Sequence, residues 1–539
     1  MNKIKYYIDF INKLPNTIVF ILFTIVLTIV YSLLYNQQLF KNQYPEEYFL
    51  ILMLMSFARD AVIWYIAALN KWVFLIFAPI MFLFGSGLNY FVTTANMGIG
   101  IGMFELLFNT NINEAAGVIH TDFIVTLIIS LIISAVFIVI RFFMNGIKRW
   151  KIKGLLLLVF LMPVFLGKLP EDDLKEVKYG KGGATERGIH LMPEKILENF
   201  YHYSLNQYRI NKMLKNRSKL ATIQVDYDEL NEANPEIIVF ILTDALRRDH
   251  MQINGYERET TPYLIENGFI SYNDMYACET STTRSVPCLT SRQSRKDDRM
   301  QFLKEPSILS IFKSAGFDTA WISAQNSIST SDYGANIIAS DADFIFFNDN
   351  SIKYDYELLP VLDNFLSRND KKKVVILHLN GSHWDYHIRY PEDKKIWTPE
   401  CTTWVYDCGI EEVVNAYDNT IVATDSLFND VVKRLKDKNA MIFFSSDHGQ
   451  FLGEKGMRLH QHEMLHHKEV AVVPFGVWLS EKAKENNKYP YIINNKDKYT
   501  SHDNIFHSIA HCGGLSSSLI DENLSICSDK LISLPNEFP

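Results

Sequence analysis

Three short apolar segments in the C-terminal half of the chain each end at side chains that can bind a metal. These side chains are Asp244 after Glu236–Thr243, His383 after Val374–Leu379, and Asp447 and His448 after Met441–Ser446. A single acidic residue at such a position often only caps a helix, whereas potential metal ligands after all three segments favour a metal site. Zinc takes carboxylate and imidazole ligands and keeps one position open in catalytic sites. We therefore predict that Asp244, Asp447 and His448 bind zinc, with manganese or another divalent ion as the alternative.

A hydroxyl-rich segment, 278–288, offers candidates for a nucleophile that such a metal would activate. Its sequence is C-E-T-S-T-T-R-S-V-P-C. A bound metal helps to remove the proton of a hydroxyl group, which makes the oxygen nucleophilic. A short turn that leads into a helix also points backbone N–H groups toward an anion. A capped turn without a catalytic role would explain the same composition.

Histidines near these segments are candidates for contacts with substrate. The loop after Asp447-His448 contains Gly449, Gly453 and Gly456 and returns at His460. His383 and His460 could hold a phosphate or protonate a leaving group. Exposed or cap-bonded histidines are common, so neither residue is informative alone.

The elements expected around these residues are short strands that alternate with helices. The strands are Glu236–Thr243, Thr319–Ser323, Val374–Leu379 and Met441–Ser446, and the helices include Ser307–Ala315 and Glu411–Leu435. Continuous apolar strands separated by helices predict an α/β domain with a mainly parallel sheet that is buried on both faces. Ligands of such sheets bind beyond the carboxyl ends of the strands, where the candidate residues lie.

The first 170 residues differ from the rest, because they contain five long apolar runs. The runs are Asn16–Tyr35, Tyr48–Leu69, Trp72–Thr93, Phe123–Ile140 and Gly154–Gly167. A membrane-spanning helix needs about 20 apolar residues, which four of the runs supply; the fifth is short. We expect a five-helix transmembrane domain over residues 1–168.

Basic residues near the run ends predict the orientation of this domain. With five spans, Lys3, Lys5 and Lys13, Lys71, and the five basic residues between 141 and 153 all lie on one side. That side is cytoplasmic by the positive-inside rule, so the N-terminus is cytoplasmic and everything after Lys168 is exported. Residues 1–170 have a net charge of +5 and the remainder −13, and an acidic exported half argues against nucleic-acid binding.

All six cysteines lie in the exported part, which indicates an oxidising compartment. They are Cys278, Cys288, Cys401, Cys408, Cys512 and Cys527. Pairing of neighbours along the sequence is the simplest arrangement, although six cysteines allow about 15 connectivities. A zinc cluster is the rival interpretation, but the chain has no C-x-x-C spacing.

Residues 169–235 are polar and separate the two halves. Within them, Glu198 to Leu220 mixes aromatic with basic residues, which fits helices at the membrane surface, and a plain linker fits equally well. The expected catalytic domain is 236–539.

The candidate segments together resemble the bacterial phosphoethanolamine transferases, which include the lipid A modifying enzymes and the mobile colistin-resistance enzymes. Segment 278–288 is similar to the family pattern C-G-T-x-T-x-x-S-V-P-C. Further similar segments are Asp244–His250, Asn254–Pro262, Ser382-His383 with Arg389-Tyr390-Pro391, and Asp447–Gly449 with Leu452–Glu454. The resemblance runs from the five-span domain to about His460.

This resemblance implies roles for individual residues. Thr282 is implied as the nucleophile and as a fourth zinc ligand, with Thr280 or Thr283 in its place if the register is shifted. His383 and His460 are implied to face substrate, and Thr110 and Glu114 to help hold the lipid head group. Two disulfides are implied, Cys278–Cys288 and Cys401–Cys408.

The chain also departs from the family pattern at three positions. The first ligand is Asp244, where the family usually has Glu, and Gln450 replaces a usual acid after D-H-G. Leu106 stands where Asn is usual. The shorter Asp244 side chain requires a shift of the strand end or favours another metal.

The activity implied by the resemblance is transfer of phosphoethanolamine from phosphatidylethanolamine to an envelope acceptor through a phospho-threonine enzyme. The acceptor would be a lipid A phosphate or a lipooligosaccharide core sugar. The implied enzyme is a monomer of the bacterial inner membrane with a periplasmic catalytic domain.

Three alternative functions fit parts of the same pattern. One is a phosphoglycerol transferase of the lipoteichoic-acid synthase kind, and another is a membrane-tethered phosphatase or sulfatase. The C/S-x-P-x-R motif of sulfatases is absent from the sequence. The third is an inactive lipid sensor, suggested by Asp244 and Gln450.

Overall fold

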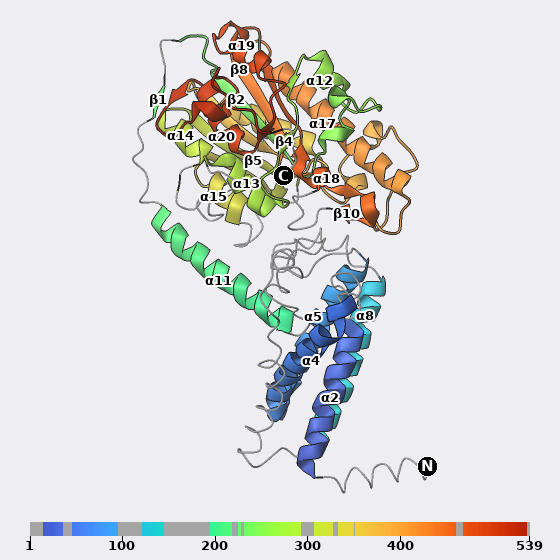
Figure 1. Cartoon of the computed structure of the whole chain (residues 1–539). Helices are drawn as coiled ribbons and strands as arrows, with labels where there is room; N and C mark the ends of the chain where they lie inside the picture. Colours follow the sequence, from blue (N-terminus) through green and yellow to red (C-terminus); the bar gives the residue numbers. More distant parts are fainter. Residues whose placement is uncertain are drawn as a thin grey trace. The chain divides into compact units, whose positions relative to one another are not determined.

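The computed structural model describes residues 15–35, 46–94, 121–144, 194–217, 225–227, 231–292, 305, 307–326, 333–349, 351–459 and 467–535. The chain divides into two compact units (Figure 1). The N-terminal unit is Met1–Phe104 with Val118–Leu205, and the C-terminal unit is Glu105–Gly117 with Asn206–Pro539. The predicted boundaries at 168 and 235 remain predictions.

The described part of the N-terminal unit contains four long helices that match four of the apolar runs. They are α2 (Asn16–Tyr35), α4 (Glu46–Leu69), α5 (Lys71–Thr94) and α8 (Thr121–Phe143). Three stretches, Asn16–Tyr35, Lys71–Phe91 and Thr121–Phe143, are long and apolar enough to cross a membrane, with mean hydropathies of 2.6, 1.8 and 3.2. The fifth run, Gly154–Gly167, lies outside the described residues, so the count of five spans remains a prediction.

The core of this helical unit is aromatic, whereas much of its outer surface is aliphatic. Tyr31 and Trp64 are fully buried and meet edge to face, with ring centroids 5.1 Å apart. Arg141 at the end of α8 donates from Nε to the Ala68 carbonyl at 2.6 Å, and therefore satisfies a backbone oxygen at the end of α4. Large aliphatic side chains such as Ile76 and Ile132 are more than half exposed, as expected for a lipid-facing surface.

A single helix, α11 (Glu194–Arg217), occupies the region that we expected to be helical or a linker. Ile196 at its start is buried in the core of the helical unit. Phe200, Tyr201 and Tyr208 are about half exposed or more. Exposed aromatic rings beside basic residues are typical of helices at a membrane interface.

A seven-stranded mixed sheet forms the centre of the C-terminal unit, in the order β3-β12-β8-β2-β7-β5-β6. The strands are β2 (Ile237–Thr243), β3 (Ile270–Ser271), β5 (Asp318–Asn326), β6 (Phe344–Asn348), β7 (Lys373–His378), β8 (Ala440–Ser446) and β12 (Phe475–Leu479). The strands from β8 to β6 pair in parallel, as predicted for the four strands read from the sequence. β12 pairs antiparallel with both β8 and β3 and forms a mixed edge that the sequence analysis did not anticipate.

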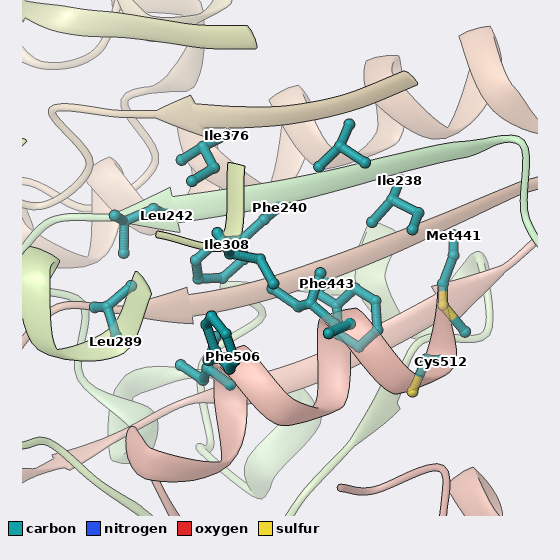
Figure 2. Packing of buried hydrophobic residues seen from close by; sticks show 14 of the residues in the cluster. Ile238, Phe240, Leu242, Leu289, Ile308, Ile376, Met441, Phe443, Phe506 and Cys512 are labelled. Atoms are coloured by element: carbon teal, nitrogen blue, oxygen red, sulfur yellow. The ribbon is translucent and has the colours of Figure 1, made fainter. Parts of the chain in front are cut away.

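Helices cover both faces of this sheet. On one face, Ile238, Phe240 and Leu242 of β2 join a buried cluster with α13 (Thr282–Thr290), α14 (Ile308–Ser314), α15 (Tyr333–Ala339) and α20 (Asp503–Cys512) (Figure 2). On the other face, Phe444 of β8 meets Phe428 of α17 (Ile410–Leu435), with ring centroids 5.1 Å apart. Burial on both faces explains why the central strands are continuously apolar.

Shorter elements complete the described part of the C-terminal unit. The remaining strands are β1 (Asp226–Tyr227), β4 (Met275–Tyr276), β9 (Phe451–Leu452), β10 (Arg458–Leu459), β11 (Val472–Val473), β13 (Thr500–Ser501) and β14 (Leu515–Ser516), and the remaining α-helices are α12 (Pro262–Glu266), α16 (Leu359–Leu366), α18 (Lys468–Ala471) and α19 (Tyr489–Asn494). The cysteines form the three expected pairs of neighbours, Cys278–Cys288, Cys401–Cys408 and Cys512–Cys527.

Buried histidines on α20 give a prediction about acid stability. Burial lowers the pKa of His507 from 6.5 to about 4, and its Nδ1 accepts the N–H of Asp521 at 3.0 Å. Between these two pH values the unfolded chain binds more protons than the folded one, so the free energy of unfolding falls as the pH falls. Gln can accept the same N–H bond without titrating. Acidification from pH 7.5 to pH 5 should therefore lower the free energy of unfolding of His507→Gln by up to about 2 kcal/mol less than that of the wild type.

Denaturant unfolding of the full-length chain at both pH values measures this difference. The free energy of unfolding of the variant should fall less between pH 7.5 and pH 5 than that of the wild type. An equal loss of stability in the two proteins on acidification would show that His507 does not titrate in this range.

Candidate active site

The site is built where three neighbouring parallel strands end. β2 lies between β7 and β8, with Leu242 opposite His378 and Thr243 opposite Ser446. The next residue after β2 is Asp244, and the next after β8 is Asp447. The register therefore places two carboxylates side by side at one edge of the sheet, as the rule for parallel sheets predicts.

Asp244, Asp447 and His448 come together as a buried group of metal-ligand type. One ligand atom of each lies within 4.8 Å of those of the other two. His448 Nε2 is 3.5 Å from Asp447 Oδ2 and 4.0 Å from Asp244 Oδ1. All three residues are at most 1% exposed. Two carboxylates that share a buried space repel each other unless a cation or a proton lies between them.

Hydrogen bonds orient these side chains for a cation. His448 Nδ1 is 2.9 Å from the Gly449 carbonyl, so Nδ1 carries the hydrogen and Nε2 presents its lone pair. Asp447 Oδ1 accepts the N–H groups of Ala245 at 3.1 Å and His448 at 2.7 Å. Asp447 Oδ2 is buried and accepts no hydrogen bond from the residues that the structure describes. An oriented imidazole and a free carboxylate oxygen fit a divalent cation.

The turn after Asp244 holds an unusual backbone conformation. Ala245 has φ +55°, in the left-handed region that a residue with a Cβ rarely adopts. Its N–H is bound by Asp447, and its carbonyl accepts the Tyr417 hydroxyl at 2.7 Å. The same hydroxyl accepts the Arg247 N–H at 2.7 Å. These bonds fix the strained turn and with it the direction of Asp244.

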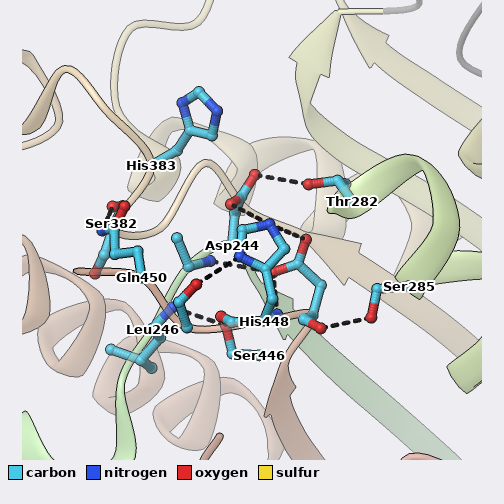
Figure 3. A network of polar contacts seen from close by, with 12 residues as sticks. Asp244, Leu246, Thr282, Ser285, Ser382, His383, Ser446, His448 and Gln450 are labelled. Carbon is cyan, nitrogen blue, oxygen red and sulfur yellow. Dashed lines mark hydrogen bonds and ion pairs between the residues drawn. The ribbon is translucent and has the colours of Figure 1, made fainter. Parts of the chain in front are cut away.

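Thr282, the predicted nucleophile, lies beside this group (Figure 3). Its Oγ1 is 3.4 Å from Asp244 Oδ2, and it is the first residue of α13. Thr282 is partly exposed, whereas the three ligand candidates are buried. The hydroxyl therefore sits between the ligand group and solvent. Backbone N–H groups at the start of α13 add a favourable environment for a phosphate.

The buried His502, which the sequence analysis did not identify, contacts the segment that contains Thr282. His502 Nε2 lies 2.9 Å from the Ser446 carbonyl, and its Nδ1 accepts the Cys278 N–H at 3.3 Å. Ser285 of α13 donates to the Asp447 carbonyl at 2.5 Å. These contacts hold the segment that contains Thr282 against the end of β8, and the Cys278–Cys288 disulfide closes the same segment. Only folding brings His502 here, because 224 residues separate it from Cys278.

The loop Asn380–His383 passes directly over the end of β2. Asp355 accepts the N–H groups of Asn380 at 2.9 Å and Gly381 at 2.8 Å, while burial raises the pKa of its carboxyl. Gln450 donates to the Ser382 carbonyl at 2.8 Å, which gives this departure from the family pattern a structural role. The loop is therefore held from both sides.

Gly381 gives a prediction about the geometry of this loop. Its φ is +53°, and a Cβ at this position would lie 2.9 Å from both the N and O atoms of Asp244. Because backbone atoms cannot yield to a Cβ, Gly381→Ala is expected to displace the loop or Asp244. We expect at least about a tenfold loss of enzymatic activity, as small misplacements at active sites commonly cause.

Activity of the purified variant and its metal-free melting temperature measure the effect. Gly268→Ala is a matched control, since Gly268 also has positive φ but has open space at its Cβ position. A Gly381→Ala enzyme as active as the Gly268→Ala enzyme would contradict the close approach.

His383 lies at the rim of the ligand group rather than within it (Figure 3). Arg389 donates from Nε to the His383 carbonyl at 3.1 Å and contacts the ring at Nδ1 at 3.3 Å. The guanidinium thus fixes the position of the ring. The other predicted substrate residues, Thr110, Glu114 and His460, lie outside the described residues.

Arg247 is part of the scaffold behind the site. Its guanidinium binds Asp249 at 2.7 Å and Glu454 at 2.5 Å, and its side chain is 4% exposed. These partners hold the loop after D-H-G against the turn after β2. Two segments that are similar to the family pattern are therefore in direct contact.

Comparisons with known proteins identify a family and relatives of this chain. A family model described as Sulfatase matches residues 236–515. The chain is 28% identical over 436 residues, or 76% of each chain, to the Kdo(2)-lipid A phosphoethanolamine 7''-transferase of Escherichia coli strain K12.

Solved structures share the fold. The chain superposes on the integral membrane lipooligosaccharide phosphoethanolamine transferase A (EptA) of Neisseria meningitidis with a TM-score of 0.78 at 21% identity, covering 94% of this chain and 97% of that one. The C-terminal periplasmic domain of EptC from Escherichia coli, solved in complex with Zn, matches with a TM-score of 0.51 at 22% identity, covering 58% of this chain and 91% of that one.

Proposed function

Because the chain belongs to the sulfatase family, we propose that its buried ligand group and Thr282 perform a group transfer at phosphorus. The donor is phosphatidylethanolamine, and the transferred group is phosphoethanolamine. The acceptor is a lipid A phosphate or a lipooligosaccharide core sugar. The similarity to a lipid A phosphoethanolamine transferase over three quarters of both chains supports this choice.

The observation that carries the proposal is the position of the Thr282 hydroxyl. Its oxygen lies 3.4 Å from Asp244, at the edge of a buried group of two carboxylates and an imidazole. A hydroxyl at such a place is accessible to substrate and adjacent to the charge that activates it.

Zinc fits the ligand set best. Asp244, Asp447 and His448 would hold it, and Thr282 would occupy the remaining position. A bound zinc ion would lower the pKa of the threonine hydroxyl and offset negative charge on the phosphoryl oxygens. The zinc complex of a structural relative supports this identification.

The residues of the chain then divide the reaction into two displacements. Thr282 Oγ1 attacks phosphorus while its proton leaves toward Asp244 Oδ2, the acceptor of its hydrogen bond. The bond between phosphorus and the diacylglycerol oxygen breaks, and diacylglycerol leaves with the proton that Asp244 accepted. The oxygen of an acceptor hydroxyl group then attacks the phosphorus of the phosphoethanolamine-threonine, and the proton of that hydroxyl passes to Thr282 Oγ1 as the bond between Oγ1 and phosphorus breaks. Each step replaces one P–O bond by another, so no further reactant is needed.

The helical unit explains why the donor is a membrane lipid. Its apolar helices anchor the chain in the bacterial inner membrane, and we place the N-terminus in the cytoplasm and the catalytic unit in the periplasm. The three disulfides fit an oxidising compartment. We propose that the enzyme acts as a monomer.

Mass spectrometry of envelope glycolipids with and without the gene tests this function. We expect phosphoethanolamine on lipid A or the core sugar only when the gene is present. Phosphoglycerol on Thr282 would instead indicate a phosphoglycerol transferase, and release of free phosphoethanolamine to water without acceptor would indicate a hydrolase. Unchanged glycolipids in an otherwise active strain would favour a sensor.

A further inference from the structure

A glutamine on a neighbouring strand contacts the first candidate metal ligand. Gln325 lies near the end of β5, which pairs with β7, the strand beside β2. Its Nε2 lies 2.8 Å from Asp244 Oδ2 and 3.3 Å from the Leu379 carbonyl. The two hydrogens of this amide nitrogen are therefore divided between the ligand and the loop that follows β7.

The contact distinguishes the two oxygens of Asp244. Oδ2 accepts from Gln325 and from the Thr282 hydroxyl, whereas Oδ1 faces His448 Nε2 at 4.0 Å. A carboxylate held at one oxygen loses the rotation that would exchange the two. Its other oxygen then points steadily toward the remaining ligands.

Gln325 is itself held in place by its own strand. Its main-chain N–H donates to Ser323 Oγ at 3.1 Å, and Ser323 Oγ lies 3.0 Å from Nδ1 of the buried His378. The Leu379 carbonyl that Gln325 contacts lies directly before the loop over Asp244. The amide thus connects a fixed strand end to Asp244, which directly precedes the strained turn at Ala245.

We propose that Gln325 is a positioning residue of the metal site, which holds Asp244 so that Oδ1 faces His448 and Oδ2 faces Thr282. This role rests on the proposed metal-dependent function. Partners that orient a ligand from outside the coordination shell typically contribute about 10- to 100-fold to metal affinity. Loss of the amide should therefore weaken metal binding without removing any ligand.

Gln325→Met separates this role from simple packing, because methionine has similar length and no donor. We would measure zinc affinity of the full-length chain in detergent by competition with a chelator, and melting of the metal-free protein alongside. The expected result is about 10- to 100-fold weaker zinc binding, with little change in metal-free melting.

Asn348→Leu is the control for the loss of a side-chain amide that is not near the ligand group. Asn348 closes the end of β6 by donating to the Ala324 carbonyl at 2.9 Å and does not contact the ligand group in the described structure. This variant should melt at a lower temperature and bind zinc as the wild type does. If Gln325→Met does not fold, Gln325→Asn, whose amide is one methylene too short to reach Asp244, gives the same comparison.

The outcomes separate this role from the proposed function. Zinc binding by Gln325→Met as tight as that of the wild type, with the wild type binding normally, would overturn the positioning role alone. A wild type that binds no zinc would overturn the metal-dependent function and this role with it.

Discussion

Thr282→Ala is expected to abolish phosphoethanolamine transfer, with a loss of at least about 10³-fold, because removal of a nucleophile leaves only binding and electrostatic stabilisation. The hydroxyl is the group 3.4 Å from Asp244, and alanine cannot form the covalent intermediate. Activity is measured as phosphoethanolamine transferred to lipid acceptor by the full-length enzyme. In the same preparation, incubation with donor alone should modify the peptide that contains Thr282 in the wild type only.

Neighbouring threonines provide matched controls for this result. Thr280→Ala and Thr283→Ala remove the same group within the same disulfide-closed segment and also test the register of the family pattern. The Thr283 carbonyl would clash with a Cβ placed on Gly334, and Thr280 is buried. Both variants should still form the modified enzyme. If Thr282→Ala kept the label and Thr283→Ala lost it, the nucleophile would be Thr283.

The central part of the sheet could be predicted from the sequence because its strands carry a strong local signal. β2, β7 and β8 are continuous apolar runs, and each is followed by the residues that form the site. Their parallel pairing follows from the helices between them. The antiparallel edge could not be predicted in this way, because β3 has only two residues and β12 is not marked by the turn signals of a hairpin.

Some residues of the site can be identified from local sequence patterns, whereas others are identified only by long-range contacts. Asp244, Asp447 and His448 stand at strand ends, so periodicity alone made them candidates. Gln325 and His502 gave no such signal, because their meaning depends on contacts with residues 81 and 56 positions away, Asp244 and Ser446. Sequence spacing says nothing about which side chains surround a ligand, since the order of strands in the sheet decides it.

Gly381 shows an intermediate case. The resemblance at Ser382-His383 marked the loop as part of the site, but it did not explain why a glycine stands at position 381. The structure supplies the reason, which is backbone contact with Asp244 at a positive φ. A motif can thus be recognised from the sequence while its physical cause requires the neighbouring strand.

Asp447→Asn is expected to remove metal binding, with zinc affinity more than about 100-fold weaker, because partners outside the coordination shell alone account for about 10- to 100-fold. Asparagine keeps the oxygen that accepts the N–H groups of Ala245 and His448, so the turn should persist. It replaces the buried Oδ2, which is the oxygen available to a cation.

Asp447→Asn should not lower the stability of the metal-free protein, although it weakens metal binding. Without a cation, two adjacent buried carboxylates repel each other and destabilise the fold, and Asp447→Asn removes one of the two charges. The metal-free variant should therefore melt at the same temperature as the metal-free wild type or higher. Zinc at 100 times its dissociation constant stabilises the wild type by about 2.7 kcal/mol, and this gain should be absent from the variant.

Asp425→Asn distinguishes this behaviour from the loss of any buried acid. Asp425 is as buried as Asp447, but it accepts the N–H groups of Tyr263 at 2.8 Å and Leu264 at 2.9 Å at the start of α12. Its replacement should leave the zinc-induced rise in melting temperature intact. Replacement of a charged metal ligand should keep or raise the melting temperature of the metal-free protein and should remove the stabilisation by zinc. An Asp447→Asn protein that zinc still stabilises would therefore exclude Asp447 from the metal site.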